Sequence, residues 1–415
     1  MAQAKKIVLA YSGGLDTSVA IKWLQDLGWD VVTLVVDVGA NADLASIQDK
    51  AVQLGVARAY AVDARAHFAE RFLMPALKAD ALYEGVYPLA SALSRPLIAE
   101  LLVAVAHREG ATAVAHGCTG KGNDQVRFDV AVAALDPALQ VVAPVREWAF
   151  SRDQEIGYAQ EHGIAVPVTA AAPYSVDVNL WGRSVEGGVL EDPAHPVPDD
   201  AWAWTADPDG SPASAQLSIR FDQGVPVALD GAPLPLPSLL SELNAVAGQC
   251  GVGRLDIIEN RLVGIKSREV YEAPAAVTLL AAHQALEQLV LTRDLARLKS
   301  SLASEYARLA YEGLWYTPSR EALDAFMDEA NQPVTGEVEL ALSHGRVTVV
   351  GRTAAQSLYR TELATYGSGD AFDHQSAEGF VALFGLSLRT RARVRPIEPA
   401  SLEALEVQVR AVQHA

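Results

Sequence analysis

Cysteine is almost absent from this sequence, which holds only Cys118 and Cys250 among its 415 residues. The two lie far apart and form no C-x-x-C pair, which excludes a disulfide framework and a cysteine-based zinc site. Long apolar runs are missing as well, since no stretch approaches the roughly 20 residues of a membrane helix. The apolar run after Lys5 and Lys6 is broken too early for a signal peptide. We therefore expect a soluble protein of the reducing cytoplasm, without a membrane partner.

The sequence also has few positively charged residues relative to negatively charged ones. The chain has 33 Lys and Arg residues against 51 Asp and Glu residues, which gives a formal net charge of −18 and a pI near 4.9. The electrostatic field of such a protein repels nucleic acids and anionic membrane surfaces. The composition therefore predicts no nucleic-acid partner.

A chain of 415 residues with 50% hydrophobic residues can fill more than one core, so two domains are the default expectation. From residue 6 to about 167, strand-like and helix-like segments alternate. This alternation predicts an α/β domain in which helices cover both faces of a parallel sheet. Beyond about residue 168, alternating apolar stretches around turn signals predict an α+β domain with antiparallel strands. We place these domains at 1–167 and 168–395, followed by a helical tail over 396–415.

Apolar residues at helical spacing predict a first helix that begins near Asp16 and ends at Gly28. A continuous apolar run, typical of a buried strand, follows over 31–36. Ser151 and Gln154 have the spacing of a capping box at a helix start. The same kinds of signal predict the remaining elements of this domain, namely helices over 44–54, 95–109 and 151–163 and strands over 57–62 and 112–115.

Two turn signals predict hairpins in the second domain. Gln223-Gly224 separates the stretches 216–221 and 225–229, and His344-Gly345 lies within 337–350. The pattern over 273–311 predicts a long, mostly helical segment, and 400–412 a short amphipathic tail helix. The tail helix has two equally weighted interpretations, packing on its own domain or on a neighbouring subunit.

The first informative motif is Ser12-Gly-Gly-Leu-Asp-Thr-Ser18, which directly follows a strand-like run ending at Tyr11. Two glycines permit a tight turn and let backbone amides approach a ligand, and the next helix begins at the same spot. The loop lacks the lysine of the G-x-x-x-x-G-K-[ST] motif, so the hydroxyls of Ser12, Thr17 and Ser18 would supply the donors. The motif predicts a site for a nucleotide phosphate. The structural alternative is an ordinary strand-to-helix turn.

A second motif, His116-Gly-Cys-Thr-Gly-Lys-Gly-Asn-Asp-Gln-Val-Arg-Phe-Asp129, concentrates glycines and polar groups at another strand end. Within it, Arg127 can neutralise a phosphate or carboxylate, and Asp124 can accept from an ammonium group. This inventory fits an amino acid bound next to a phosphate. Because loops at the carboxyl ends of parallel strands share one crevice, we expect this loop to converge with the 12–18 loop. The structural alternative is a glycine-rich turn capped by Asn123.

Two further stretches carry many polar residues. Residues 173–192 alternate small polar and apolar residues at the predicted domain junction, where ligand sites are frequent. Residues 256–261 and 266–272 place charged residues beside apolar strand residues. A solvated linker and a solvated strand face are the structural alternatives, and for the charged strands that alternative is the favoured interpretation.

Together these stretches resemble a known family. The segment from Ala10 to Ser18 resembles the pyrophosphatase loop of the N-type ATP pyrophosphatases, a motif that several enzymes share. With the 116–129 motif, Asn179 to Pro193, Gly264 to Arg268 and Tyr271-Glu272, the chain resembles the argininosuccinate synthase family over almost its whole length. The resemblance implies an ATP-binding PP-loop domain, adenine nucleotide alpha hydrolase-like, followed by a synthetase and multimerisation domain with a C-terminal tail helix.

The resemblance also implies a ligand for individual residues. Those implied to contact ATP are Ala10, Tyr11, Ser12, Gly13, Gly14, Leu15, Asp16, Thr17, Ser18, Val36 and Gly117. Those implied to hold aspartate are Thr119, Asn123 and Asp124. Those implied to hold citrulline are Tyr87, Asn123, Arg127, Ser175, Ser184, Glu259 and Tyr271. The sequence departs from the family pattern at Ala40, Ala92 and Cys118. Each departure concerns a single contact and leaves the implied activity unchanged.

The implied reaction joins citrulline to aspartate through a citrullyl adenylate, cleaves ATP to AMP and pyrophosphate, and uses Mg²⁺ shared with the triphosphate. The family resemblance further implies a homotetramer. No protein metal site and no general base are predicted. Two alternatives stay open, a different ATP pyrophosphatase-type synthetase and a nucleotide-sensing binding protein without turnover. The missing cysteine pairs argue against a thiolase, and the polar sets over 116–129 and 175–184 argue against a sensor.

Overall fold

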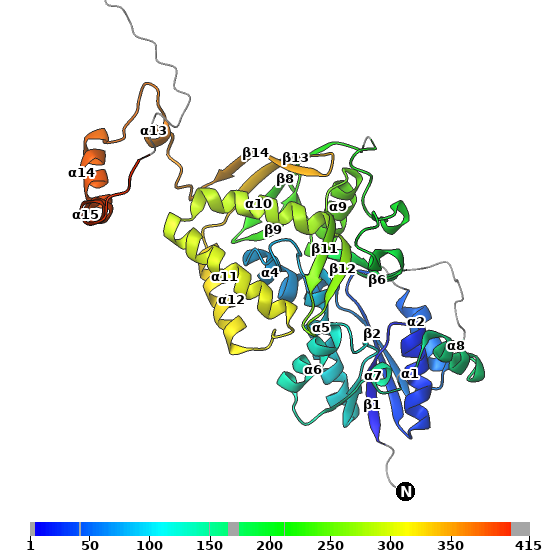
Figure 1. The fold of residues 1–415 in the computed structure, drawn as a ribbon. Helices are drawn as coiled ribbons and strands as arrows, with labels where there is room; N and C mark the ends of the chain where they lie inside the picture. The colour runs from blue at the N-terminus through cyan, green and yellow to red at the C-terminus, as the bar shows by residue number, and fades with distance from the viewer. Residues whose placement is uncertain (1–4, 41–42, 149, 165–173, 211, 400–415) are drawn as a thin grey trace, which may run out of the picture. The chain divides into compact units, whose positions relative to one another are not determined.

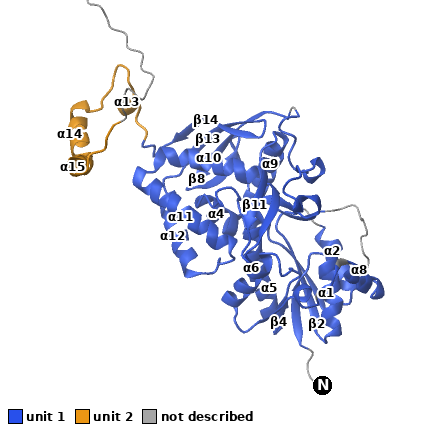
Figure 2. Cartoon of the chain, viewed as in Figure 1, with its two compact units in different colours: residues 1–358 blue, residues 359–415 orange. Residues whose placement is uncertain are grey.

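The structure is a computed structural model of the chain, and it describes residues 5–40, 43–148, 150–164, 174–210 and 212–399 (Figure 1). The chain forms two compact units, Met1–Leu358 and Tyr359–Ala415 (Figure 2). All residues predicted to bind a ligand belong to the first unit. The predicted domain boundary near residue 167 falls inside this unit and stays a prediction.

A five-stranded parallel sheet forms the N-terminal part of the first unit. Its strands have the order β3-β2-β1-β4-β5, and every neighbouring pair is parallel. The strands are β1 Lys6–Ala10, β2 Asp30–Asp37, β3 Arg58–Asp63, β4 Ala113–Ala115 and β5 Gln140–Val142. The strand order reverses between β1 and β4, so the loops after these two strands border the crevice where such sheets bind ligands. The predicted α/β domain is confirmed.

Helices cover both faces of this sheet (Figure 1). They include α1 Leu15–Asp26, α2 Leu44–Gln53, α5 Ala90–Glu109, α6 Asp124–Leu135, α7 Pro144–Trp148 and α8 Arg152–Glu161. Successive side chains of β1 point to opposite faces. Ile7 packs in a core with residues of α1 and α8, whereas Val8 packs in a core with residues of α5 and α6. The predicted capping box between Ser151 and Gln154 is present at the start of α8.

Helix α5 differs from its prediction, because it begins at Ala90 and not at Arg95. A proline favours the first turn of a helix, but Pro96 lies inside α5. Buried Ala92 and Leu93 pack the extra turn into the core, and this tertiary packing overrides the local signal. In the described part of the chain, α5 alone is long and apolar enough to cross a membrane, and 61% of its most apolar window is buried inside the protein.

Two antiparallel sheets form the C-terminal part of the first unit. One has the order β11-β12-β7-β6 and the other the order β10-β9-β8-β13-β14. Their strands are β6 Ser175–Asn179, β7 Gly182–Glu186, β8 Ala215–Asp222, β9 Val225–Leu229, β10 Ala232–Pro233, β11 Arg254–Asn260, β12 Lys266–Glu272, β13 Gly336–Ser343 and β14 Arg346–Ala354. Both predicted hairpins are confirmed, as β8–β9 and β13–β14.

The helical segment predicted over 273–311 is present as two helices. The longer helices of this part are α9 Leu236–Gln249, α10 Pro274–Val290, α11 Arg293–Tyr311 and α12 Pro318–Asn331. The shorter helical segments of the first unit are α3 Arg65–Phe68, a π-helical turn Ala69–Leu73, α4 Met74–Lys78 and the 3₁₀ turns Gly188–Glu191 and Asp199–Ala201. Phe68 and Phe72 pack in one core with Leu239 and Tyr306, so the segment around α3 and α4 belongs to the core of the C-terminal part.

The second unit consists of short helices and their connections (Figure 2). Many of its apolar side chains are exposed. The helices are α13 Thr361–Ala364, α14 His374–Phe384 and α15 Leu386–Val394. None of the residues in these three helices is buried, and Phe380 and Phe384 are 64% and 73% exposed. Exposing apolar side chains to water is energetically unfavourable. The tail helix predicted over 400–412 lies outside the described residues.

A buried charged cluster joins the turn after α4 to α10 and α11. The ammonium group of fully buried Lys299 contacts the carboxylate of Asp80 and lies 2.9 Å from Glu287 Oε1. His283 Nδ1 lies 3.0 Å from Asp80 Oδ1. Asp80, His283 and Glu287 are close enough to share a metal ion, but the Lys299 ammonium already supplies the positive charge between the two carboxylates. The cluster is therefore an internal salt bridge.

The hydrogen bonds of His283 fix its protonation. Its Nε2 lies 2.7 Å from Asn331 Oδ1, and the Asn331 amide nitrogen donates to two backbone carbonyls, which identifies Oδ1 as an acceptor. Its Nδ1 faces a carboxylate oxygen of Asp80. Since both ring nitrogens face acceptors, His283 is the doubly protonated imidazolium.

This cluster predicts a pH dependence of stability. Burial lowers the pKa of His283, but Asp80 and Glu287 together raise it by more, so the pKa is above its ordinary value. Such a histidine stabilises the folded state fully below the unfolded pKa of about 6.5, and this contribution is lost as the pH rises through the folded pKa. We expect the free energy of unfolding to fall as the pH rises above about 6.5 and through the raised folded pKa. In His283→Gln the slope should be flatter, as measured by urea unfolding; identical slopes would contradict this.

Candidate active site

The loop after β1 turns directly into α1. Gly13 has a left-handed φ of 79°, and a Cβ at this position would meet Ile47 side-chain atoms at 3.2 Å. Gly14 precedes Leu15, the first residue of α1. The first N–H groups of a helix have no partner inside it, so this end of α1 favours a bound anion.

The three hydroxyl groups of this loop have different surroundings. Ser12 Oγ and Thr17 Oγ1 lie 3.1 Å apart, and both residues line a pocket next to the loop. Ser18 Oγ donates to the Gly14 carbonyl at 2.7 Å and lies 3.1 Å from Tyr11 Oη. Ser18 is fully buried and stabilises the start of α1, whereas Ser12 and Thr17 face the pocket.

We call this pocket, with a volume of about 470 Å³, the loop pocket. The predicted ATP-binding residues that line it are Ala10, Tyr11, Ser12, Gly14, Leu15, Asp16, Thr17, Val36 and Gly117. Gly13 and Ser18 are not among its lining residues. His116 and Cys118 of the second motif line the same pocket, so the predicted convergence of the two loops is confirmed.

His116 fixes the start of the second motif. The backbone N–H of Cys118 donates to His116 Nδ1 at 3.2 Å, so the other ring nitrogen carries the proton and lies 2.9 Å from Asp129 Oδ1. Burial and the nearby Asp124 carboxylate raise the pKa of the Cys118 thiol far above its ordinary value. The thiol therefore stays protonated and is no nucleophile.

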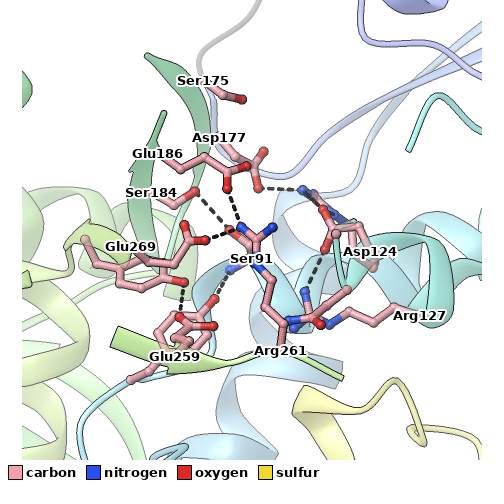
Figure 3. Close-up of a pocket in the computed structure, with 15 residues that line it drawn as sticks. Ser91, Asp124, Arg127, Ser175, Asp177, Ser184, Glu186, Glu259, Arg261 and Glu269 are labelled. Atoms are coloured by element: carbon pink, nitrogen blue, oxygen red, sulfur yellow. Dashed lines mark hydrogen bonds and ion pairs between the residues drawn. The ribbon is translucent and has the colours of Figure 1, made fainter. Parts of the chain in front are cut away.

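A second pocket, which we call the polar pocket, shares lining residues with the loop pocket. Figure 3 shows the residues that line the polar pocket. Its walls come from α5, α6 and the β11-β12-β7-β6 sheet. The predicted aspartate- and citrulline-binding residues that line it are Tyr87, Asn123, Asp124, Arg127, Ser175, Ser184, Glu259 and Tyr271. Thr119 is exposed and lines neither of the two pockets. Residues about 180 positions apart in the sequence thus meet in one site.

A chain of hydrogen bonds runs along one wall of the polar pocket. Asn123 Nδ2 donates to Tyr311 Oη at 2.8 Å, and Tyr311 Oη donates to Glu259 Oε2 at 2.7 Å. Burial raises the pKa of Glu259, although the hydroxyls of Tyr271 and Tyr311 partly offset this. Asn123 occupies the N-cap position of α6, but its side chain makes no capping bond and instead accepts from Leu262 N–H at 2.9 Å.

Asp124 lies between two guanidinium groups. Arg95 Nε donates to Asp124 Oδ2 at 2.9 Å. Arg127 Nη1 donates to Asp124 Oδ1 at 2.6 Å (Figure 3). Burial raises the pKa of Asp124, but Arg95 and Arg127 lower it by more, to about 2. Asp124 is therefore a carboxylate at neutral pH. Arg95 Nη2 also donates to Asp177 Oδ2 at 2.8 Å.

The charged strands β11 and β12 each contribute one carboxyl group to the polar pocket. Glu259 and Glu269 are buried there, and Arg261, in the turn between the strands, pairs with Glu269 at 2.5 Å and with Glu186 (Figure 3). Burial and the Glu186 charge raise the pKa of Glu269 to about 8. The interpretation of these strands as a solvated face is wrong for Glu259 and Glu269, which are buried, whereas Asp256 on β11 is exposed. Three carboxyl groups around one guanidinium suit a ligand ammonium group, because a bound cation would favour their ionised form.

Sequence reasoning missed several residues of this site. Arg95, Asp177, Glu186, Arg261 and Glu269 line the polar pocket, and Tyr311 bonds to two of its residues. Asp177, Glu186, Arg261 and Glu269 fall inside stretches already marked as polar, which is the one signal that pointed to them. Arg95 and Tyr311 lie in segments predicted only as helices.

The parallel sheet, the glycine-rich loop after its first strand and the adjoining polar pocket define a nucleotide-binding protein of the PP-loop class. The family model for the arginosuccinate synthase N-terminal HUP domain matches residues 6–165. The model for the arginosuccinate synthase C-terminal domain matches residues 174–391. The chain belongs to the argininosuccinate synthase family.

Curated relatives are similar over almost the whole chain. The argininosuccinate synthase of Oceanobacillus iheyensis is 53% identical over 98% of this chain and 98% of its own length. That of Bacillus pumilus is 54% identical over 96% of this chain and 99% of its own length. That of Symbiobacterium thermophilum is 56% identical over 94% of this chain and 98% of its own length.

Proposed function

We propose that this protein is an argininosuccinate synthase, which joins L-citrulline to L-aspartate and cleaves ATP to AMP and pyrophosphate in arginine biosynthesis. Family membership supports this activity. The observation that carries it is that the loop pocket and the polar pocket share Arg95, Asp124 and Asp177. Transfer of an adenylyl group to an amino acid requires that the nucleotide site and the amino-acid site meet at the α-phosphorus, and these residues mark such a junction.

In this proposal the loop pocket holds ATP, and the α1 N-terminus with the hydroxyls of Ser12 and Thr17 binds phosphate oxygens. The polar pocket holds both amino acids. Arg127 suits a substrate carboxylate, and the excess of carboxylates around Glu259 suits an α-ammonium group. The proposed aspartate ligands are Thr119, Asn123 and Asp124, and the proposed citrulline ligands are Tyr87, Asn123, Arg127, Ser175, Ser184, Glu259 and Tyr271.

The ureido carbon of citrulline is a poor electrophile, so the proposed reaction has two steps. First, the ureido oxygen attacks the α-phosphorus, the bond to the bridging oxygen breaks, and pyrophosphate leaves with the electron pair. Then the aspartate amine attacks the ureido carbon of the citrullyl adenylate, AMP leaves with its electron pair, and the amine nitrogen loses a proton. Holding the reactants in near-attack geometry contributes up to roughly 7–11 kcal/mol in favourable systems.

Mg²⁺ bound to the triphosphate is part of this proposal. Carboxylate oxygens suit this ion, and Asp16, Asp124 and Asp177 line the loop pocket. Asp16 belongs to the phosphate loop itself, and we propose that its carboxylate holds the ion. When bound, Mg²⁺ neutralises charge on the departing pyrophosphate.

The activity is tested by omitting one substrate at a time. We expect purified protein to release AMP and pyrophosphate only when ATP, citrulline and aspartate are all present, because the adenylate is consumed only by the aspartate amine. AMP release measured by chromatography after each omission checks this. If citrulline and aspartate together fail to stimulate AMP release, the proposed activity is wrong.

We further propose that the protein is a homotetramer of the cytoplasm. The exposed apolar surface of the second unit supports self-association, because such a surface is costly in water. The low cysteine content and the family's biosynthetic reaction support the cytoplasm.

A further inference from the structure

Arg95 is the one arginine or lysine among the residues that line the loop pocket in the described structure. Three carboxylates, those of Asp16, Asp124 and Asp177, line the same pocket. His116 adds no charge there, because its Nδ1 accepts a hydrogen bond and the ring is neutral. An ATP triphosphate would therefore enter a pocket with more negative than positive side chains, and a single guanidinium would carry much of the compensation.

The Arg95 side chain is held rigidly at the junction of the two pockets. It projects from the second turn of α5 and is largely buried. Its Nε donates to Asp124, its Nη2 to Asp177 at 2.8 Å and its Nη1 to Ser94 Oγ at 3.0 Å. Partners on α5, α6 and β6 thus fix the plane of the Arg95 guanidinium. Hydrogen-bond donors that are fixed before the reaction stabilise developing charge most effectively.

We propose that Arg95 is a catalytic residue that contacts the non-bridging oxygens of the α-phosphoryl group. This inference rests on the proposed function, since it requires that the nucleotide lies in the loop pocket and citrulline in the polar pocket. Arg95 lines both pockets, whereas Arg127 and Arg261 line only the polar pocket. The planar guanidinium has the donor spacing that two phosphate oxygens require.

The contact serves both steps without a proton transfer. In the first step the ureido oxygen bonds to the α-phosphorus as the bond to pyrophosphate breaks, and charge accumulates on the non-bridging oxygens. In the second step the bond between the ureido carbon and the phosphate oxygen breaks, and AMP leaves with one more negative charge on the same phosphate. Arg95 donates hydrogen bonds to this group throughout and remains protonated.

The first step can be measured alone as citrulline-dependent exchange of labelled pyrophosphate into ATP, without aspartate. We expect Arg95→Gln to slow the exchange by about 10²-fold and Arg95→Lys by about 10-fold. Lysine keeps the positive charge but lacks the planar set of N–H donors of a guanidinium. The half-saturating ATP concentration should change by less than about fivefold, since the contact acts mainly in the transition state. Circular dichroism and the melting temperature establish that both variants are folded.

The two α-phosphorothioate diastereomers of ATP separate a contact from a structural role. Each replaces one non-bridging α-oxygen by sulfur, so a direct contact makes the exchange rate depend on which oxygen is replaced. We expect Arg95→Gln to change the rate ratio of ATP to at least one diastereomer by about fivefold or more. Arg261→Gln removes a guanidinium from the polar pocket alone, and it should slow exchange while leaving both ratios at wild-type values.

The outcomes are distinguishable. Wild-type protein that shows no citrulline-dependent exchange overturns the proposed function itself. Two results would overturn the role of Arg95 alone, provided that the wild-type protein exchanges normally. Either Arg95→Gln slows the exchange by less than about threefold, or it slows the exchange equally for ATP and both diastereomers. The expected change of the ratio in Arg95→Gln, absent from Arg261→Gln, supports it.

Discussion

Replacing Asp124 by Ala is expected to raise the aspartate concentration that gives half-maximal AMP release by about 10²–10³-fold. Asp124 is ionised, because Arg95 and Arg127 hold its pKa at about 2, and it is our proposed partner of the substrate ammonium group. Removing one partner of a buried charge pair costs about 2–5 kcal/mol. The ATP requirement should rise by less than about tenfold, since the phosphate loop is unchanged. Initial rates at varied aspartate and varied ATP measure both effects.

A matched control separates aspartate binding from disturbance of Arg95. Asp177→Asn also removes a carboxylate from Arg95, but Asp177 is not a proposed aspartate ligand. We expect this variant to raise the aspartate requirement by less than about tenfold. Equal shifts in the aspartate and ATP requirements of Asp124→Ala would sink the proposed role of Asp124.

Replacing both Phe380 and Phe384 by Ser is expected to break the proposed tetramer. The two rings stack on α14 with centroids 5.3 Å apart, and both are exposed within the second unit. Burying one phenylalanine at an interface contributes about 1.5–3 kcal/mol, so each chain loses about 3–6 kcal/mol of association energy. This corresponds to about 10²–10⁴-fold weaker association per chain. Sedimentation velocity should show a smaller species than in the wild type.

Leu27→Ser provides the control for this substitution. Leu27 is 58% exposed at the end of α1 in the first unit, and a single exposed apolar residue is normal on a protein surface. Its replacement should leave the sedimenting mass unchanged. An unchanged mass of the double phenylalanine variant, or a wild-type protein that sediments at one chain of 44.1 kDa, would contradict the proposal.

The fold was predictable where its determinants are local. The apolar run of β1, the glycines of the 12–18 loop and the hairpin turns at Gln223-Gly224 and His344-Gly345 act within a few residues, and all are present as predicted. The start of α5 was not predictable, because its first turn is stabilised by core residues distant in the sequence. The grouping of residues 64–97 with the C-terminal core depends on tertiary contacts in the same way.

The groups of residues that form the site were predictable from the sequence, but the pairing of their charges was not. The motifs around the 12–18 loop and residues 116–129 occur together because both follow strands of one parallel sheet. Arg95 pairs with Asp124 and Asp177, which are 29 and 82 positions away, and no local pattern encodes either pairing. Glu259 and Glu269 lie in charged stretches that have the sequence pattern of a solvated surface, and only the tertiary structure buries them.

The shared wall of the two pockets has a consequence for a reactive intermediate. A citrullyl adenylate would be a bivalent ligand, with its nucleotide half in the loop pocket and its amino-acid half in the polar pocket. Such a molecule escapes only when both halves detach together, because a half that detaches alone rebinds at the high effective concentration set by its tether. Each separate substrate dissociates once it detaches from a single pocket. The same architecture that admits and releases small substrates freely would therefore retain the activated species until an amine consumes it.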